Sequence, residues 1–267
     1  MLEFIKNQLN KLNIDLVSCL SLDECEITRP YLLEKRGITN GSVVIFAVPY
    51  LSEHSTEKRN ISAYAVSRDY HIFFKNLFED FIANLTKAYP EYIFAGFSDH
   101  SPINEVRAAA QAGLGVLGKN HLLITEKYSS FVFIGEIITN APLPSLATSV
   151  SSCIGCNKCV SACPVNADIN ACLSAITQKK GELTDKEVEM MLENGSIWGC
   201  DVCQNVYPYT RKADFTPISF FDEGVITELD TATLDSMTDE EFMSRPFSWR
   251  GRSVIRRNTL IYDKNKK

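Results

Sequence analysis

Four cysteines packed into twelve residues constrain this chain more than any other feature of its sequence. Residues 153–164 read C-I-G-C-N-K-C-V-S-A-C-P, so the thiols are separated by two, two and three residues and a proline follows. This spacing is typical of a loop that wraps a single iron–sulfur cluster, with the last thiol directed to a second cluster. Cys153, Cys156 and Cys159 are therefore expected to bind one cluster, while Cys163 is expected to begin a helix and bind the other.

Thiols for the second cluster stand downstream, at Cys172, Cys200 and Cys203. With Cys163 they make a full set of four ligands for a 4Fe-4S cluster. The first cluster has only three, because Tyr207 stands in C-D-V-C-Q-N-V-Y-P where an eighth cysteine is needed. The incomplete site admits a three-iron (3Fe-4S) cluster, a cubane with an oxygen or water ligand, or no stable cluster. Ligation by the tyrosine ranks below the three-iron cluster, because a hard phenolate matches a soft thiolate site poorly.

Two other uses of cysteine fit the sequence less well. The Cys-x-x-Cys pairs 153/156 and 200/203 resemble a zinc ribbon, but the pairs of such ribbons stand closer together, and zinc needs no third and fourth thiol in the same loop. Disulfides require an oxidising compartment, and nothing in the sequence indicates one. Cys19 and Cys25 lie outside any metal spacing and are interpreted as buried free thiols, with a role as stray ligands left open.

Length and composition describe an ordinary globular chain. Its 267 residues suffice for one large domain or two modest ones, and 45% hydrophobic and 22% charged residues are typical of soluble proteins. The net charge of −6 gives no general attraction to nucleic acid. Residues 1–8 lack the basic and then apolar run of a signal peptide, and the longest apolar run, residues 43–48, is too short to span a bilayer. These features predict a cytoplasmic protein without a membrane partner.

Apolar periodicity predicts the regular elements. Helices are expected where apolar residues recur three or four positions apart, and strands where short apolar runs occur. The expected helices are residues 2–12, 70–85 and 184–192, and the expected strands are residues 14–20, 42–50, 92–97 and 131–139. The strand 42–50 is apolar throughout, as in a strand covered on both faces. Thr184 and Glu187 match a capping box at the start of their helix.

Polar residues gather before the helix 70–85. Tyr64, Arg68, Asp69 and His71 are interpreted either as the lining of a pocket or, for Asp69, as the cap of that helix. Asp99 follows the strand 92–97, which is the usual position of a site residue in α/β folds, and a capping role is equally consistent with its position.

Glycines mark the segment after the next helix. Ser101 and Pro102 are expected at the first positions of that helix, and Gly113 closes it. The run G-L-G-V-L-G-K-N, residues 113–120, follows a helix rather than a strand, so it is a weak dinucleotide fingerprint. Its glycines are interpreted as positions where the backbone closely approaches a large ligand. Five arginines between 245 and 258 either meet phosphate or form a solvated face.

Eight segments carry a further pattern. They are 64–71 (Y-A-V-S-R-D-Y-H), 99–105 (D-H-S-P-I-N-E), 112–120 (A-G-L-G-V-L-G-K-N), 133–137 (F-I-G-E-I), 153–164, 171–174 (A-C-L-S), 199–204 (G-C-D-V-C-Q) and 251–258 (G-R-S-V-I-R-R-N). Taken together and in this order, the segments resemble the epoxyqueuosine reductase family. The resemblance spans nearly the whole chain, which is far more specific than the cluster motif alone.

The resemblance implies a cobalamin-dependent reductase that removes the epoxide oxygen from epoxyqueuosine in tRNA, the last step of queuosine synthesis. The implied fold class is α+β or α/β, with a cobalamin-binding domain similar to that of reductive dehalogenases and a two-cluster ferredoxin-like module. Asp99 matches the family's acid, which protonates the substrate oxygen; beside an apolar cofactor face its pKa is expected to be raised. The clusters would pass single electrons to cobalt, and an external donor of the ferredoxin or flavodoxin type would supply them.

The resemblance also assigns the parts of the chain. The candidate cobalamin-binding residues are Tyr64, Arg68, Asp69, His71, Gly115, Gly118, Lys119 and Asn120. The expected domains are a cobalamin-binding domain (1–145), an iron–sulfur domain (146–212) and a C-terminal extension packing back on the first domain (213–267). A polar, proline-marked stretch, residues 141–152, separates the first two.

Three departures from the family pattern keep other functions open. Tyr207 replaces a cluster cysteine, the segment between Cys163 and Cys172 is short, and the chain stops where the family's C-terminal helical repeats, which help hold tRNA, would begin. tRNA is therefore the less secure partner. The alternatives are a corrinoid- and cluster-bearing electron-transfer or cobalamin-activating protein without a substrate of its own, and a reductase of a small molecule.

Overall fold

The computed structural model describes residues 1–265, which form two compact units, each assembled from separated stretches of chain. Unit 1 comprises Met1–Tyr50, Phe73–Gly155 and Lys212–Ile218, and unit 2 comprises Leu51–Ile72, Cys156–Arg211 and the chain from Ser219 onward. The three domains expected from the sequence (1–145, 146–212 and 213–267) instead follow chain order. As a division by function they stay a prediction.

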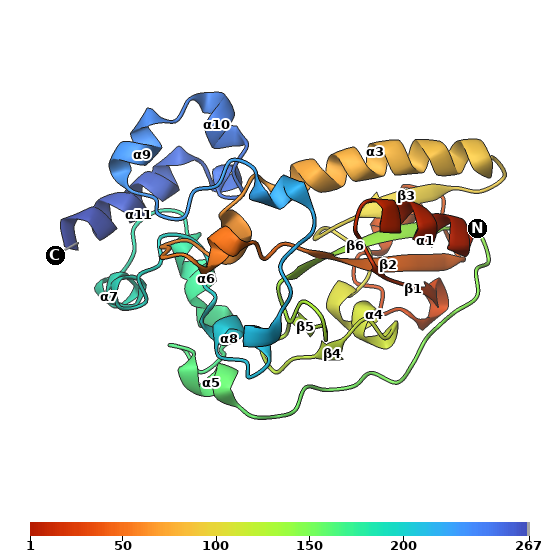
Figure 1. Cartoon of the computed structure of the whole chain (residues 1–267), viewed down its shortest axis with the longest axis horizontal. Helices are drawn as coiled ribbons and strands as arrows, with labels where there is room; N and C mark the ends of the chain where they lie inside the picture. The colour runs from red at the N-terminus through yellow and green to blue at the C-terminus, as the bar shows by residue number, and fades with distance from the viewer. Residues whose placement is uncertain (266–267) are drawn as a thin grey trace. The chain divides into compact units, whose positions relative to one another are not determined.

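Unit 1 is organised by a four-stranded sheet (Figure 1). The strands are β1 (Leu16–Ser21), β2 (Ser42–Pro49), β3 (Phe94–Phe97) and β6 (Val132–Thr139), in the order β1-β2-β6-β3. Every neighbouring pair is antiparallel, so of the two predicted classes the sheet fits α+β, because α/β folds rest on parallel strands. All eight residues of β2 are buried, which confirms the prediction for this strand.

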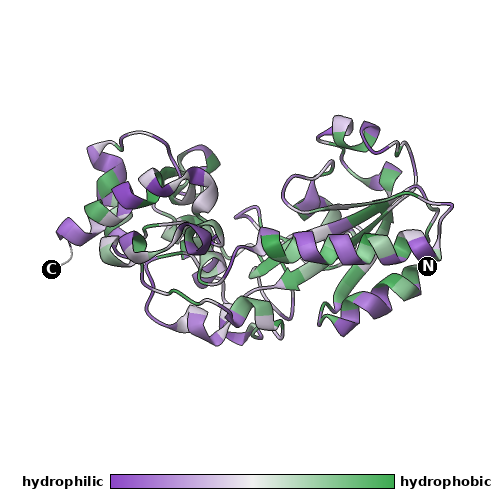
Figure 2. Ribbon diagram, turned by 90° about the horizontal axis from the view of Figure 1, so that it is seen from above, coloured by the Kyte–Doolittle hydropathy of each residue, from purple (hydrophilic) through white to green (hydrophobic). Residues whose placement is uncertain are grey.

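Helix α3 (Tyr70–Ala88) lies along one face of this sheet and confirms the predicted aromatic helix. Its buried residues Phe74 and Phe81 belong to an apolar stripe at helical spacing, and Figure 2 shows hydrophobic and hydrophilic bands alternating along this helix. The approach is close: a Cβ added at Gly96 of β3 would lie 2.3 Å from the Phe78 ring. Helix α1 (Leu2–Lys11) adds further buried leucine and isoleucine side chains to unit 1.

The opposite face of the sheet carries α4 (Glu105–Gln111), whose three consecutive alanines are buried against it. The prediction that Ser101 and Pro102 begin this helix is wrong. The N-cap is Asn104, whose side chain accepts a hydrogen bond from the Arg107 N–H at 3.3 Å, whereas Ser101 Oγ accepts only from Ile103 N–H, in a turn before the helix. Unit 1 also contains α2 (Pro30–Glu34) and the short hairpin of β4 (Val116–Leu117) and β5 (Leu123–Ile124).

Unit 2 is built from short helices around a second apolar core. The helices are α5 (Lys158–Ala162), α6 (Leu173–Thr177), α7 (Asp185–Glu193), α8 (Val202–Asn205), α9 (Thr231–Ser236), α10 (Asp239–Met243) and α11 (Arg252–Asn265). Trp198, fully buried, packs edge-on against Phe247 with ring centroids 6.2 Å apart. The capping box predicted at Thr184 and Glu187 is confirmed at the start of α7.

Buried asparagine side chains connect the separated segments of unit 2. Asn60 donates to the Leu229 carbonyl and accepts from the Leu229 N–H, each at 2.8 Å. Asn258 of α11 donates to the carbonyls of Thr177 and Ile197, at 2.7 and 2.8 Å. In the part of the chain that the structure describes, no helix is both long and apolar enough to cross a membrane.

Candidate functional site

The four cysteines of the complete ligand set all belong to unit 2. Cys163 ends α5 rather than beginning a helix, so this detail of the prediction is wrong. Cys172 is the residue before α6, Cys200 lies two residues before α8, and Cys203 is in α8. Because α5 packs against α8, elements far apart in the sequence present thiols to the same region of unit 2.

Charge interactions show that three of these thiols lie close together. Burial first, together with the charges of Cys203, Asp201 and Cys172, raises the pKa of the Cys200 thiol to about 12. Within residues 1–265, no three His, Cys, Asp or Glu side chains converge as the ligands of one metal ion do. The four thiolates of a cubane stand farther apart, since each binds a different iron. Free thiols without disulfides at these positions therefore fit an iron–sulfur cluster.

The three-cysteine set is less uniform. Cys153 belongs to unit 1, whereas Cys156, which is exposed, and Cys159 belong to unit 2. Tyr207, in the position of the missing thiol, is half-buried, and its ring meets the Tyr209 ring edge-on at 5.7 Å. The ligand sets themselves stay predictions.

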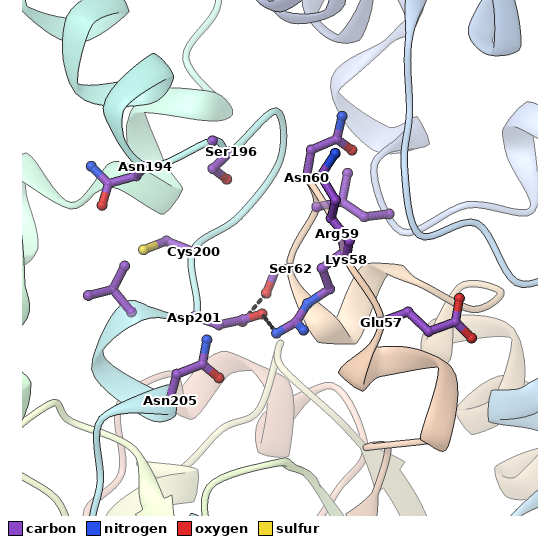
Figure 3. Close-up of a pocket in the computed structure, with 13 residues that line it drawn as sticks. Glu57, Lys58, Arg59, Asn60, Ser62, Asn194, Ser196, Cys200, Asp201 and Asn205 are labelled. Carbon is purple, nitrogen blue, oxygen red and sulfur yellow. Dashed lines mark hydrogen bonds and ion pairs between the residues drawn. The ribbon is translucent and has the colours of Figure 1, made fainter. Parts of the chain in front are cut away.

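Asp201 organises the Cys200–Cys203 loop from within (Figure 3). Its carboxylate accepts hydrogen bonds from the Ser62 hydroxyl, from the Ala63 N–H at 2.7 Å and from Arg59 Nη2 at 2.8 Å. Gln204 adds a longer bond at 3.3 Å. The Asp201 side chain is 5% exposed and that of Arg59 is 16% exposed, so this ion pair is largely shielded from water. No local sequence pattern predicts this pair, because its two residues stand 142 positions apart in the chain.

A polar pocket of about 340 Å³ lies beside this ion pair, entirely within unit 2. Its lining residues come from 57–62, 194–196, 200–202 and 205, and include Cys200 (Figure 3). Cys200 therefore lines a polar cavity and also packs on the apolar cluster of Leu173, Ile176 and Met191.

The predicted cofactor residues of unit 2 are held in place by neighbouring side chains. Asp69 caps α3: its Oδ1 accepts from the His71 N–H at 3.0 Å and lies 2.8 Å from His71 Nδ1. The His71 ring stacks on Tyr70 with centroids 4.2 Å apart, and Tyr64 is half-buried against the apolar core. Arg68 pairs with a glutamate, Glu223 Oε2, at 3.0 Å. The capping interpretation of Asp69 is thus confirmed, and its cofactor role stays a prediction.

The predicted cofactor residues of unit 1 form the β4–β5 hairpin. A Cβ added at Gly115 would lie 2.4 Å from the Ile124 carbonyl oxygen, and Gly118 donates its N–H to Leu122 O at 2.9 Å. Asn120 Oδ1 accepts from the Leu122 N–H at 3.4 Å, and Lys119 is exposed. Close packing of the backbone within the hairpin accounts for the glycines, and contact with a cofactor there stays a prediction.

The arginine run is not a simple solvated face. Arg245 is buried and donates to the Gly224 carbonyl, and Arg252 donates to the Leu234 carbonyl at 2.7 Å. Arg257 donates to a further carbonyl, that of Lys179, at 2.7 Å. These arginines join segments of unit 2.

Asp99 is exposed and lies on the loop after β3 with a left-handed backbone (φ 62°). Its N–H donates to Glu105 Oε1 at 2.9 Å. Two further acids of unit 1, the half-buried Glu105 and the fully buried Glu136, have raised pKa values. Burial, and then the Asp99 charge, raise the pKa of Glu105 to about 7, and burial, and then the Glu105 charge, raise the pKa of Glu136 well above its ordinary value. A glutamate inside the apolar strand 131–139 was the one sequence signal of this cluster.

Comparisons with known proteins agree with these motifs. Residues 38–99 match the family model "Epoxyqueuosine reductase QueG, DUF1730", and residues 148–168 match the model of a 4Fe-4S binding domain. The epoxyqueuosine reductase of Listeria monocytogenes is 32% identical over 243 residues, which cover 82% of this chain and 63% of that protein. The chain therefore spans less than two thirds of the length of this relative.

Solved structures share the fold. The epoxyqueuosine reductase of Streptococcus thermophilus matches with a TM-score of 0.78 and 24% identity, over 97% of this chain and 80% of that one. An epoxyqueuosine reductase solved with a modified tRNA-Tyr stem loop matches with a TM-score of 0.76 and 22% identity, over the same shares.

Proposed function

Because the chain is a relative of the epoxyqueuosine reductases, we propose that it is an iron–sulfur, cobalamin-dependent reductase that removes the epoxide oxygen of epoxyqueuosine in tRNA. The single observation that carries the proposal is the ordered set of motifs. It combines a family match that ends at Asp99 with a 4Fe-4S match over the four cysteines between residues 153 and 163.

The clusters are proposed to accept single electrons from an external donor. Cys163, Cys172, Cys200 and Cys203 would hold a complete 4Fe-4S cluster, and Cys153, Cys156 and Cys159 would hold the incomplete one. The buried pair of Asp201 and Arg59 supports this role for the complete set, because it fixes the loop that carries two of the four thiols.

Bound cobalamin would supply the reducing chemistry for opening the epoxide, which no amino-acid side chain provides. The residues proposed to hold it are Tyr64, Arg68, Asp69, His71, Gly115, Gly118, Lys119 and Asn120. Asp69 and Glu223 orient His71 and Arg68, which supports a preorganised polar surface. Asp99 is proposed to donate its proton to the oxygen released when the carbon–oxygen bond opens, and its exposed position after β3 leaves it accessible to a substrate.

The substrate is proposed to be a tRNA stem loop, as in the solved relative that carries one. The test uses the full chain purified without oxygen, with cobalamin, a chemical reductant and an epoxyqueuosine-modified stem loop. We expect formation of queuosine, and Asp99→Asn should lower kcat by about 10²- to 10⁴-fold with cobalamin binding unchanged. Asp23→Asn, at an exposed aspartate of unit 1, is the matched control. Absence of both cobalamin uptake and turnover would overturn the proposal.

The tyrosine in place of a cluster thiol favours one second candidate, an electron-transfer or cobalamin-activating protein. Its test is Tyr207→Cys, which restores the eighth ligand. If the chain is a reductase with an incomplete cluster, this variant should gain iron and keep its turnover. Clusters and cobalamin bound with no turnover in either form would favour the second candidate.

A further inference from the structure

Glu136 of β6 is a fully buried acid that the proposed function does not use. It is 0% exposed and lies in the middle of the sheet, in register with Phe97 of β3 and Ile45 of β2. Neither of its carboxyl oxygens has a hydrogen-bond partner of normal geometry. An ionised carboxylate in such a place is strongly destabilised, so this side chain holds a proton at neutral pH.

Glu105 connects this buried acid to the Asp99 loop. It is the first residue of α4, it is half-buried, and its Oε1 accepts the Asp99 N–H at 2.9 Å. The charges of Glu105 and Glu136 act on each other, and the charge of Asp99 acts on both. Three acids thus form a chain from the exposed loop to the centre of the sheet.

The groups around the three acids do little to neutralise them. Arg29 lowers the pKa of Glu105, but its Nη1 donates to the Ser101 carbonyl at 2.9 Å. Burial, followed by the charge of Glu136, raises the pKa of the Cys25 thiol to about 12. Cys25 and Ser101 bring no positive charge, and Arg29 is the cation that acts on Glu105. Like charges at such proximity cannot all ionise, and the pair titrates as a unit.

We propose that Glu105 and Glu136 hold a shared proton at neutral pH and return it to Asp99 after each turnover, while Glu105 positions Asp99 through its backbone amide. This inference rests on the proposed function for the turnover step alone. The acids are not a metal site, since among the described residues no three such side chains are arranged around an ion. The unpartnered and fully buried Glu136 side chain is what a proton store requires and a surface acid cluster lacks.

The proton balance is simple. Asp99 gives its proton to the oxygen freed by carbon–oxygen cleavage and is left as a carboxylate. The proton held by the pair passes to Asp99, which restores the acid and leaves the pair with one more negative charge. A proton from water then enters through the half-buried Glu105 and refills the pair. No electron moves in these steps, so the reductant of the proposed reaction is unaffected.

Infrared spectroscopy of the full chain tests the shared proton without any turnover. At pH 7 the wild type should show the C=O stretch of a protonated carboxyl that weakens as the pH rises further. Glu136→Gln should lose this band, Glu105→Gln should shift its frequency and its pH dependence, and Glu126→Gln, at an exposed glutamate of unit 1, should leave it unchanged. A wild type without this band at pH 7 would overturn the proposal whether or not the protein is a reductase. If a glutamine variant fails to fold, the pH dependence of the wild-type band decides.

The pH profile tests the return of the proton. In Glu136→Gln we expect kcat to fall about tenfold above pH 7 and little below it, with KM unchanged, because solvent can supply protons directly at low pH. Glu136→Asp, which keeps an acid, should recover part of the loss. An equal loss at every pH would indicate a purely structural role and contradict the proposal. Failure of the wild type to turn over would instead contradict the proposed function, and the infrared result would still stand.

Discussion

The two candidate chemical sites differ in what holds their residues in place. The acids of unit 1 stand at a sheet strand, β6, and at the first residue of α4, which packs on the sheet. The thiols of unit 2 stand in loops and in helices of four or five residues, α5, α6 and α8. Backbone ladders and apolar packing fix the acids, whereas the loop that carries Cys200 and Cys203 is braced by side-chain bonds, chiefly those of Asp201 with Arg59 and with the Ala63 N–H. Unit 1 should therefore keep its geometry without a cofactor, and unit 2 should depend on one.

Loss of a cluster ligand should give the largest difference between the two units. Cys200→Ala is expected to remove the four-cysteine cluster, roughly half of the bound iron, and to loosen unit 2, because the free energy of metal binding contributes directly to folding. Iron and sulfide counting, with amide hydrogen exchange followed unit by unit, measures both effects. Exchange in β2 and β6 should change little.

Cys19→Ala is the matched control, since Cys19 is a fully buried thiol of β1 outside the ligand sets. It should keep all of the iron and alter exchange in unit 1 only. A Cys200→Ala protein that retains its full iron content would contradict the ligand assignment.

The brace within unit 2 should give the second largest effect. Asp201→Ala leaves the buried Arg59 guanidinium without its partner and the Ala63 N–H without an acceptor. Breaking a buried pair from one side costs about 3–5 kcal/mol in the free energy of unfolding. Asp235→Ala, which breaks a half-exposed pair with Arg256, should cost less than about 1 kcal/mol. If denaturant unfolding shows equal losses of unfolding free energy for Asp201→Ala and Asp235→Ala, Asp201 does not brace unit 2.

The contrast also explains how far the sequence could predict this protein. The apolar residues of β2 and α3 form clear strand and helix patterns, so these two elements could be predicted. The cysteine spacing matches that of an iron–sulfur loop, so the cluster motif could be predicted as well. The start of α4 was not, because Ser101 and Asn104 are both good caps and the packing of the alanines decides between them. Asp201 acquires its role from Arg59, 142 positions away in the chain, and no window of sequence contains both residues.

The acids of unit 1 should give a smaller and pH-dependent effect. An unfolded glutamate ionises near pH 4.5, while the pKa of Glu105 is about 7 in the native protein and burial raises the pKa of Glu136 well above its ordinary value. Between these values the native state binds more protons than the unfolded state, so stability falls as the pH rises. Glu136→Gln should therefore stabilise the protein at pH 8, where the native state resists ionisation of Glu136, and hardly at all at pH 4.5. Exposed Glu126→Gln should show no such slope in urea unfolding. If Glu136→Gln leaves the pH dependence of the free energy of unfolding unchanged, these acids are not its cause.

The smallest effect should come from the end of a single helix, α7. Thr184 Oγ1 accepts the Glu187 N–H at 3.3 Å, and Glu187 Oε2 accepts the Thr184 N–H at 2.8 Å, so the two residues cap each other. Thr184→Ala removes one of these bonds and should cost about 1 kcal/mol. Because α7 packs on α6, the helix that follows Cys172, hydrogen exchange should quicken in both helices if unit 2 depends on local braces. Glu189→Ala, at an exposed position of the same helix, should leave exchange in α6 unchanged. If hydrogen exchange quickens only in the first turn of α7, then α6 is stable without the cap of α7. Unit 2 would then depend less on local braces than the comparison with unit 1 implies.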